Sequence, residues 1–330
     1  MTPRPVIYAS SGWGVHDQRW TSALEACGFA VSVHLDGPDL RSEVEASLPE
    51  HAPVLAGPLI PVTARLIELD RRLVGLSWGF DLQEGHSRSV SREELSWLHQ
   101  LDALIVDSPS SRILAIESGM NPEHIHLIPW GIDTEAFQPT GPQAELPFEG
   151  DCRVVLSLRT HDLLYRTADV LEAFAAAALI DPDLRMVMAG SGPLTPDHRA
   201  RADELGLAHK LWFPGAVPEA QVAELLRSAD VYVSAAETDG TSVTLLQAMS
   251  CRVPVIVSDT PGNSWWVDDG QTGRTFPVGD TSTLAELMVT ASRDDASLDA
   301  AATLVNDRAD WAVNLLALRD IMAGDDEPGT

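Results

Sequence analysis

The stretch from Val231 to Asp259 constrains the fold of this chain more than any other part of it. It begins with a short apolar run, Val-Tyr-Val-Ser, which is typical of a buried parallel strand. A polar Asp-Gly-Thr-Ser segment, residues 239–242, interrupts the apolar pattern. Apolar residues then recur with helical spacing from Val243 until Pro254 ends the helix and another apolar run begins. The stretch therefore predicts a strand, a loop, a helix and a second strand.

The Asp-Gly-Thr-Ser loop precedes the N-terminus of the expected helix and has two interpretations. The unpaired amides and the positive dipole of a helix N-terminus suit an anion, most often a phosphate. Alternatively, the hydroxyl of Thr241 or Ser242 only caps the helix. The local sequence leaves both interpretations open, because capping boxes and phosphate loops share the same residue types.

The same alternation of apolar runs and helical patterns occurs twice along the chain. The first series occupies residues 1–140 and the second residues 150–305, and residues 138–150, rich in Pro, Gly and polar side chains, are expected to link them. Residues 91–100 are expected to be helical, and a helix at residues 306–323 is expected to cross back to the first domain. This order predicts an α/β protein with two doubly wound, Rossmann-like parallel sheets facing a cleft.

Composition limits the class of partner. The 330 residues are enough for two domains, and the net charge of -27 disfavours nucleic acid and anionic membranes. No apolar run approaches the roughly 20 residues that span a bilayer, and the N-terminus lacks the apolar segment of a signal peptide. We therefore expect a cytoplasmic protein without a transmembrane segment. The three cysteines lack metal-ligand spacing and are expected to be reduced. The sequence does not indicate the oligomeric state.

A glycine-rich loop, residues 11–14, follows the first expected strand. Glycine at position 12 allows a ligand to approach the backbone closely. As a nucleotide-binding fingerprint the loop is weak, because the third glycine of the usual pattern is missing.

Six segments of the second half, taken in order, carry a resemblance to a known family. They are Arg159, Ala-Gly-Ser-Gly-Pro-Leu at 189–194, Phe-Pro-Gly-Ala-Val-Pro at 213–218, Ala-Asp-Val-Tyr-Val-Ser at 229–234, Leu-Leu-Gln-Ala-Met-Ser-Cys-Arg-Val-Pro-Val-Ile at 245–256 and Val-Asp-Asp-Gly-Gln-Thr-Gly-Arg at 267–274. On these segments, residues 153–318 resemble the retaining glycosyltransferases of family 4, which have the GT-B fold. The resemblance extends more weakly to residues 128–137. It implies transfer of a sugar from a nucleotide-sugar to an acceptor.

The family's signature is a Glu, seven residues and a second Glu, and the matching residues here are Asp239 and Gln247. The resemblance implies that Asp239 contacts the donor sugar, as the catalytic residue, and that Gln247 contacts the ribose hydroxyls. Asp keeps the carboxylate, whereas the amide of Gln gives up the stronger charge-assisted hydrogen bond. The loop is two residues longer than in the family, so Glu237 is a competing carboxylate. Gln247 as a helix residue without a ligand is the alternative.

The family binds the donor diphosphate with an Arg and a Lys. Arg159 matches the first, and the Lys position falls at Tyr165 or Arg166, of which we favour Arg166 because it keeps the charge. The alternative for either arginine is a surface residue. The remaining expected donor contacts are Gly240, Thr241, Ser242, Gly192, Ala216 and Gly12.

The expected acceptor side lies in the first half. Its candidate residues are Trp13, His16, Asp17, Trp78 and Asp81. Many family members carry a His before a Gly where this chain has Trp78, and an indole can be neither a general acid nor a general base. A lone His in a loop is more often a surface residue, so His16 has that alternative.

No metal or cofactor is expected. Asp181 to Asp183 reads as a turn, no Cys/His cluster suggests zinc, and the family usually works without an essential metal. The prediction is a hexosyltransferase of the retaining type that uses a UDP- or GDP-type donor and a small acceptor. The alternatives are a catalytically silent nucleotide-sugar-binding protein and a sugar-nucleotide epimerase with the GT-B fold.

Overall fold

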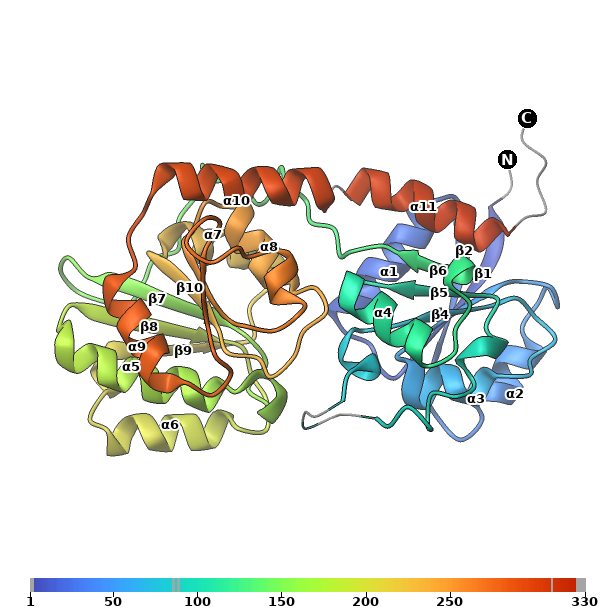
Figure 1. Cartoon of the computed structure of the whole chain (residues 1–330), viewed down its shortest axis with the longest axis horizontal. Coiled ribbons are helices and arrows are strands. Elements are labelled where there is room, and N and C mark those ends of the chain that lie inside the picture. The colour runs from blue at the N-terminus through green and yellow to red at the C-terminus, as the bar shows by residue number, and fades with distance from the viewer. Residues whose placement is uncertain (1–2, 85–86, 88–89, 310, 325–330) are drawn as a thin grey trace. The chain divides into compact units, whose positions relative to one another are not determined.

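The computed structural model describes residues 3–84, 87, 90–309 and 311–324. The chain divides into two compact units, of which the second is Gly131–Asp310 and the first is formed by Met1–Trp130 and Trp311–Thr330. Figure 1 shows both units, coloured along the chain. The division at Gly131 precedes the segment 138–150 that the sequence suggested as the linker.

The first unit contains a six-stranded parallel sheet with the order β2-β1-β3-β4-β5-β6. Its short apolar runs form strands whose residues are mostly buried, as expected for a sheet covered on both faces. The strands are β1 (Arg4–Ser10), β2 (Phe29–Leu35), β3 (Val54–Gly57), β4 (Leu73–Leu76), β5 (Ala103–Val106) and β6 (Ile125–Leu127).

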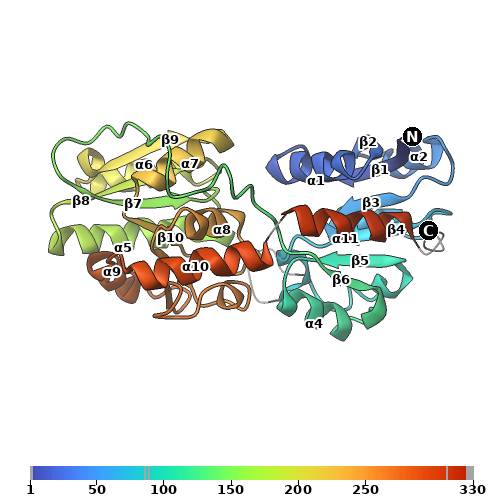
Figure 2. The same ribbon diagram turned by 90° about the horizontal axis from the view of Figure 1, so that it is seen from above.

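Helices cover both faces of this sheet: α1 and α11 lie over the face that Figure 2 looks onto, and α2, α3 and α4 pack in the core cluster of the other face. Ile7 and Ala9 of β1 pack in one core cluster with Leu40 and Val44 of α2, whereas Tyr8 points the other way and donates a hydrogen bond to α1. This alternation follows from the two-residue period of a strand. The helices are α1 (Val15–Ala26), α2 (Leu40–Ala46), α3 (Ala64–Leu66), α4 (Pro109–Glu117) and α11 (Trp311–Ala323).

The helix expected at residues 91–100 is not formed. Turns occupy most of this segment, and only Leu98–Gln100 forms a short 3-10 helix. Backbone amides of residues 91–100 donate hydrogen bonds to carbonyls three residues earlier: the amide of Leu95 donates to Arg92, and that of Leu98 donates to Leu95. The side chain of Glu94 also accepts hydrogen bonds from the amide and the hydroxyl of Ser91, which fixes a tight local turn.

The second unit contains another six-stranded parallel sheet, with the order β12-β11-β10-β7-β8-β9. The two sheets confirm the predicted fold class. The strands are β7 (Arg153–Leu158), β8 (Leu184–Ala189), β9 (Leu211–Gly215), β10 (Val231–Ser234), β11 (Val255–Ser258) and β12 (Arg274–Phe276).

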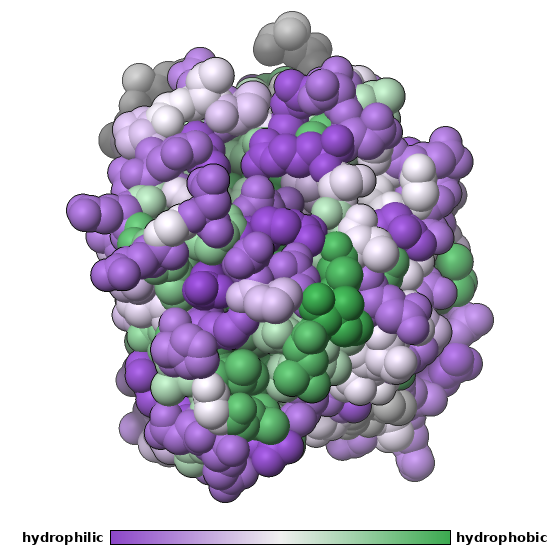
Figure 3. Space-filling view, turned by 90° about the vertical axis from the view of Figure 1, so that its left-hand side faces the viewer, coloured by the Kyte–Doolittle hydropathy of each residue, from purple (hydrophilic) through white to green (hydrophobic). Residues whose placement is uncertain are grey.

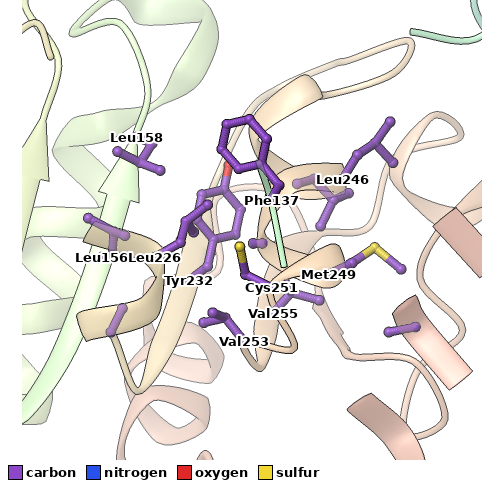
Figure 4. Close-up of a cluster of buried hydrophobic side chains, with 14 of the residues drawn as sticks. Phe137, Leu156, Leu158, Leu226, Tyr232, Leu246, Met249, Cys251, Val253 and Val255 are labelled. Atoms are coloured by element: carbon purple, nitrogen blue, oxygen red, sulfur yellow. The ribbon is translucent and has the colours of Figure 1, made fainter. Parts of the chain in front are cut away.

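Two core clusters lie on opposite faces of the second sheet. Leu156 of β7 and Tyr232 of β10 pack with Leu226 of α7 and Leu246 of α8 (Figure 4). Val155 of β7 and Val233 of β10 pack on the other face, in a cluster that includes side chains of α5 and α9. The helices are α5 (Thr167–Ile180), α6 (Thr195–Glu204), α7 (Glu219–Ser228), α8 (Val243–Ser250), α9 (Thr281–Thr290) and α10 (Asp295–Arg308).

The long helical pattern near the C-terminus forms two helices. α10 ends at Arg308 in the second unit, and α11 begins at Trp311 in the first; residue 310, within the helix expected at 306–323, lies outside the described residues. The carbonyl of Ala309 accepts a hydrogen bond from the amide of Ile132, a residue far away in the sequence. This bond takes the carbonyl away from the helical pattern and favours a helix end here.

Each sheet has a point where the strand order reverses. In the second sheet, β8 and β9 follow on one side of β7, whereas β10, β11 and β12 lie on its other side. The reversal therefore lies between the parallel neighbours β7 and β10. Open α/β sheets bind ligands at the carboxyl ends of the strands at such points. The loops after β7 and β10 are consequently the first place to look for a site.

Hydrophilic side chains dominate the face of the molecule seen in Figure 3, on one end of the second unit, and a small hydrophobic patch interrupts them. No helix in the described part of the chain is both long and apolar enough to cross a membrane. Within the same part of the chain, no group of three or more His, Cys, Asp or Glu side chains is arranged to hold a metal ion.

Candidate functional site

Arg159 joins the two loops at the reversal point of the second sheet. It follows the last residue of β7, and its guanidinium donates to Oδ2 of Asp239 at 2.7 Å and to the hydroxyl of Ser242, both in the loop after β10. The side chain of Arg159 is 9% exposed and that of Asp239 is 16% exposed. The guanidinium also lies 4.1 Å from the centre of the Tyr165 ring. The structure therefore brings the first predicted arginine to the predicted loop.

The charge of Arg159 is held by its neighbours. Burial opposes the positive charge, but the nearby Asp239 carboxylate and its hydrogen bond outweigh that effect and raise the pKa of Arg159 above its ordinary value. A buried cation paired in this way stays charged at every physiological pH. The loops at this point therefore hold a fixed positive charge that is paired with Asp239.

Ser242 is the N-cap residue of α8, but its hydroxyl accepts from Arg159 instead of capping the helix. Thr241 is also buried, and its hydroxyl accepts a hydrogen bond from the indole of Trp266 at 3.3 Å. The first amides of a helix have no partner within the helix. The side-chain contacts therefore support the anion-binding interpretation of this loop over simple capping by Thr241 or Ser242.

Arg166 contacts the same loop through an ion pair with a second carboxylate, that of Glu237. Its backbone is left-handed at the start of α5, with φ 45 and ψ 40. Its guanidinium donates to Asp169 at 2.7 Å and to Glu237 at 3.5 Å. Glu237 belongs to the loop that contains Asp239. Each predicted arginine thus has an acidic partner on this loop.

Two glycines fix the positions of these loops by close packing. A Cβ on Gly192 would lie 2.3 Å from the carbonyl oxygen of His161, and a Cβ on Gly262 would lie 1.8 Å from that of Asp239. No side chain larger than hydrogen fits at such distances. Gly192, predicted as a donor contact, therefore holds the loop that carries Arg159. Gly262, which the sequence analysis missed, supports Asp239 and Gly240; the preceding Pro261 is the only sequence signal at this position.

His161 is a second residue that sequence reasoning missed. It is 1% exposed, and Nδ1 lies 2.9 Å from the hydroxyl of Thr195, which accepts from the amide of Gly192. Burial, followed by the neighbouring His198 and Arg199, lowers the pKa of His161 to about 4. The imidazole is thus neutral at pH 7 and tethers the loop after β7 to the loop after β8. A lone histidine in a sequence gives no signal for such a role.

Gln247 is 3% exposed in the middle of α8, and Nε2 donates to Oε1 of Glu219 at 3.3 Å. Glu219 is the first residue of α7 and is exposed. Ala216, also predicted as a donor contact, is exposed in the loop between β9 and α7. Gln247 therefore has a carboxylate partner from another element, which the sequence analysis did not anticipate.

The predicted acceptor-side residues follow β1 and β4 of the first unit. Trp13 is 51% exposed, and Gly12 next to it has open space where a Cβ would lie. The ring of His16 lies 4.5 Å from that of Trp130 and 5.7 Å from that of Trp78, measured between ring centres. The structure thus gathers two of the predicted residues, His16 and Trp78, with Trp130 close to the carboxyl ends of the strands.

The two carboxylates of the acceptor side are bound by groups of the first unit itself. Asp17 accepts from the hydroxyl of Tyr8 at 3.0 Å and from the amide of Gly14 at 2.7 Å. Asp81, 1% exposed, accepts from the hydroxyl of Ser77 at 2.6 Å and from the amide of Leu59 at 2.9 Å. Burial raises the pKa of Asp81, although these hydrogen bonds oppose the shift. Both side chains shape the loops that carry the aromatic residues.

The second half of the chain is similar in sequence to known glycosyltransferases. Residues 143–306 match the family model described as glycosyl transferases group 1. The chain is 30% identical over 192 residues to phosphatidyl-myo-inositol mannosyltransferase of Mycobacterium leprae, covering 56% of this chain and 50% of that protein. It is 29% identical over 196 residues to D-inositol 3-phosphate glycosyltransferase of Mycobacterium bovis, covering 56% and 39%. The matches thus span half or less of these relatives' lengths.

Solved structures match nearly the whole chain. Anabaena HepE in complex with UDP-glucose has a TM-score of 0.78 at 16% identity, covering 97% of this chain and 99% of that one. Sucrose-phosphate synthase from Thermosynechococcus elongatus has a TM-score of 0.79 at 16% identity, covering 96% and 97%. The chain therefore has the GT-B fold of glycosyltransferases. More particularly, its second unit is related in sequence to the group 1 glycosyl transferases.

Proposed function

We propose that this protein is a retaining glycosyltransferase that moves a sugar from a UDP- or GDP-type sugar donor to a small acceptor. The observation that carries the proposal is the convergence of Arg159, Ser242 and the N-terminus of α8 at the reversal point of the second sheet. A guanidinium, a hydroxyl and unpaired amides together match the oxygens of a diphosphate. Anabaena HepE, which shares the fold, binds UDP and UDP-glucose in its crystal structures, and this supports the choice of ligand.

The reaction divides charge between two groups. As the bond between the anomeric carbon and the phosphate oxygen breaks, negative charge grows on the diphosphate and positive character grows on the sugar ring. Arg159, Arg166 and the amides of α8 stabilise the leaving diphosphate, and the protein groups alone supply the required positive charge in this proposal. Asp239 accepts hydrogen bonds from the sugar and stabilises its ring charge.

The acceptor oxygen attacks the anomeric carbon from the face that the diphosphate leaves. Its proton passes to the leaving phosphate oxygen, so that the products are the glycoside and the nucleoside diphosphate. No side-chain base is needed for this route. The engagement of Asp17 and Asp81 with groups of the first unit supports it, as does the presence of Trp78 in place of an imidazole.

The acceptor is assigned to the first unit, near Trp13 and the rings of His16 and Trp78. An exposed indole next to a glycine is suited to stack against the apolar face of a sugar or another small ring. The rings of His16 and Trp78 contribute contact area more than charge, and this favours an uncharged acceptor.

A donor screen tests the proposal. Purified protein is incubated with UDP-, GDP- and dTDP-sugars, with and without candidate acceptors, and release of nucleoside diphosphate is measured. Transfer with retention at the anomeric carbon, read by nuclear magnetic resonance, is the expected result. Binding without turnover would identify a silent binding protein, and a new nucleotide-sugar formed without acceptor would identify an epimerase. Neither binding nor turnover with any donor would refute all three.

A further inference from the structure

We propose that Glu219 supplies the carboxylate that binds the two ribose hydroxyls of the nucleotide, and that Gln247 orients this carboxylate. The inference rests on the proposed function and names a residue at the same site. It starts from a contact between α7 and α8, in which the buried side-chain amide of Gln247 donates a hydrogen bond to Oε1 of the exposed Glu219 at 3.3 Å.

The chemistry of the pair favours the carboxylate as the ligand group. A carboxylate has several acceptor positions, so one carboxylate can accept from an amide and from hydroxyl donors at the same time. Hydrogen bonds from hydroxyls to a charged acceptor are stronger than those to an amide oxygen. Dinucleotide-binding α/β proteins commonly recognise ribose hydroxyls with an Asp or Glu. In this pair, Glu219 has the matching chemistry and Gln247 is the buried support behind it.

The position of the pair suits a nucleoside whose phosphates lie at Ser242. Gln247 follows Ser242 by five residues on α8, about 7.5 Å along the helix axis at 1.5 Å per residue. This distance is comparable to the reach from the outer phosphate of a nucleoside diphosphate to its ribose. Glu219 begins α7, directly after the exposed loop at the carboxyl end of β9. The helix N-terminus favours a negative charge on Glu219.

A purely structural role makes a different prediction. If the hydrogen bond only holds α7 against α8, removing the charge of Glu219 weakens the binding of every nucleotide equally. If Glu219 binds the ribose, the loss depends on whether the 2′-hydroxyl is present. The ratio of affinities for a ribonucleotide and its 2′-deoxy counterpart therefore separates the two roles.

The experiment measures calorimetric affinities for UDP and GDP and for their 2′-deoxy forms. The wild-type protein is expected to prefer the ribonucleotide by about 10-fold or more, the worth of a hydrogen bond to a charged group. Glu219→Gln should reduce this preference to about 3-fold or less. Glu224→Gln, on the same helix, is the matched control and should keep the wild-type ratio.

A rescue variant completes the test. Glu219→Gln combined with Gln247→Glu exchanges the two groups and should restore the preference for the 2′-hydroxyl. An unchanged ratio in Glu219→Gln, or an equal loss for both nucleotides, overturns the inference while leaving the proposed function intact. If the wild-type protein binds none of these nucleotides, the proposed function fails, and the inference fails with it.

Discussion

Replacing Gly262 by alanine is expected to disable the site with little change elsewhere. The backbone of Gly262 is helical, with φ -70 and ψ -45, so alanine is conformationally allowed there. The new Cβ would nevertheless lie 1.8 Å from the carbonyl oxygen of Asp239 and 2.4 Å from that of Gly240. Since real Cβ contacts stay beyond 3.0 Å, the loop must move by at least about 1.2 Å.

A displacement of this size costs about 100-fold in kcat/KM when it moves a group that positions the substrate. That loss corresponds to about 2.7 kcal/mol of transition-state stabilisation. Overpacking should also lower the free energy of unfolding by about 1–3 kcal/mol. Donor turnover measures the first effect and thermal unfolding the second, and calorimetric affinity for UDP and GDP shows whether nucleotide binding changes as well.

Gly37→Ala is the matched control. Its Cβ would lie 3.9 Å from the nearest atom, the carbonyl oxygen of Leu35, so activity should be unchanged. Wild-type turnover and wild-type nucleotide affinity in Gly262→Ala would refute the reasoning, because the loop of Asp239 would then tolerate a large shift.

Three further outcomes follow from the described contacts. Burial lowers the pKa of His161 to about 4, below the ordinary 6.5, so as the pH falls this imidazole is protonated in the unfolded chain before it is protonated in the folded one. The free energy of unfolding should therefore fall by on the order of 3 kcal/mol between about pH 6.5 and pH 4. In urea unfolding, His161→Asn should flatten this part of the pH profile. Leu246→Ala should cost about 2–5 kcal/mol in urea unfolding, whereas Leu179→Ala, at an 85% exposed position, should cost less than about 0.5 kcal/mol; equal costs would contradict the assigned core. Glu237→Gln should raise the affinity for UDP or GDP about 2- to 5-fold by calorimetry, because its carboxylate competes for Arg166; an unchanged or lower affinity would contradict that competition.

The sequence predicted the elements whose signals are local. Short apolar runs and helical periodicity indicated two parallel sheets, and the reversal of strand order places Arg159 and Ser242 together. Residues 91–100 were wrongly expected to be helical, because apolar periodicity does not distinguish a series of three-residue turns from an α-helix.

The partners of individual side chains could not be read from the sequence. The pairs Gln247–Glu219 and His161–Thr195 join residues 28 and 34 positions apart. Their contact depends on how neighbouring helices and loops pack, which no local pattern encodes. The same holds for Asp17 and Tyr8, whose hydrogen bond forms only once α1 lies against β1.

The most direct test of the account compares nucleoside diphosphates with monophosphates. Calorimetry would give affinities of the wild-type protein and of Arg159→Gln for UDP, UMP, GDP and GMP. The wild-type protein is expected to prefer one diphosphate over its monophosphate by at least about 10-fold, and Arg159→Gln is expected to lose most of this preference. Equal affinity of the wild-type protein for diphosphate and monophosphate, or a preference that survives the loss of Arg159, would contradict a diphosphate site at the start of α8.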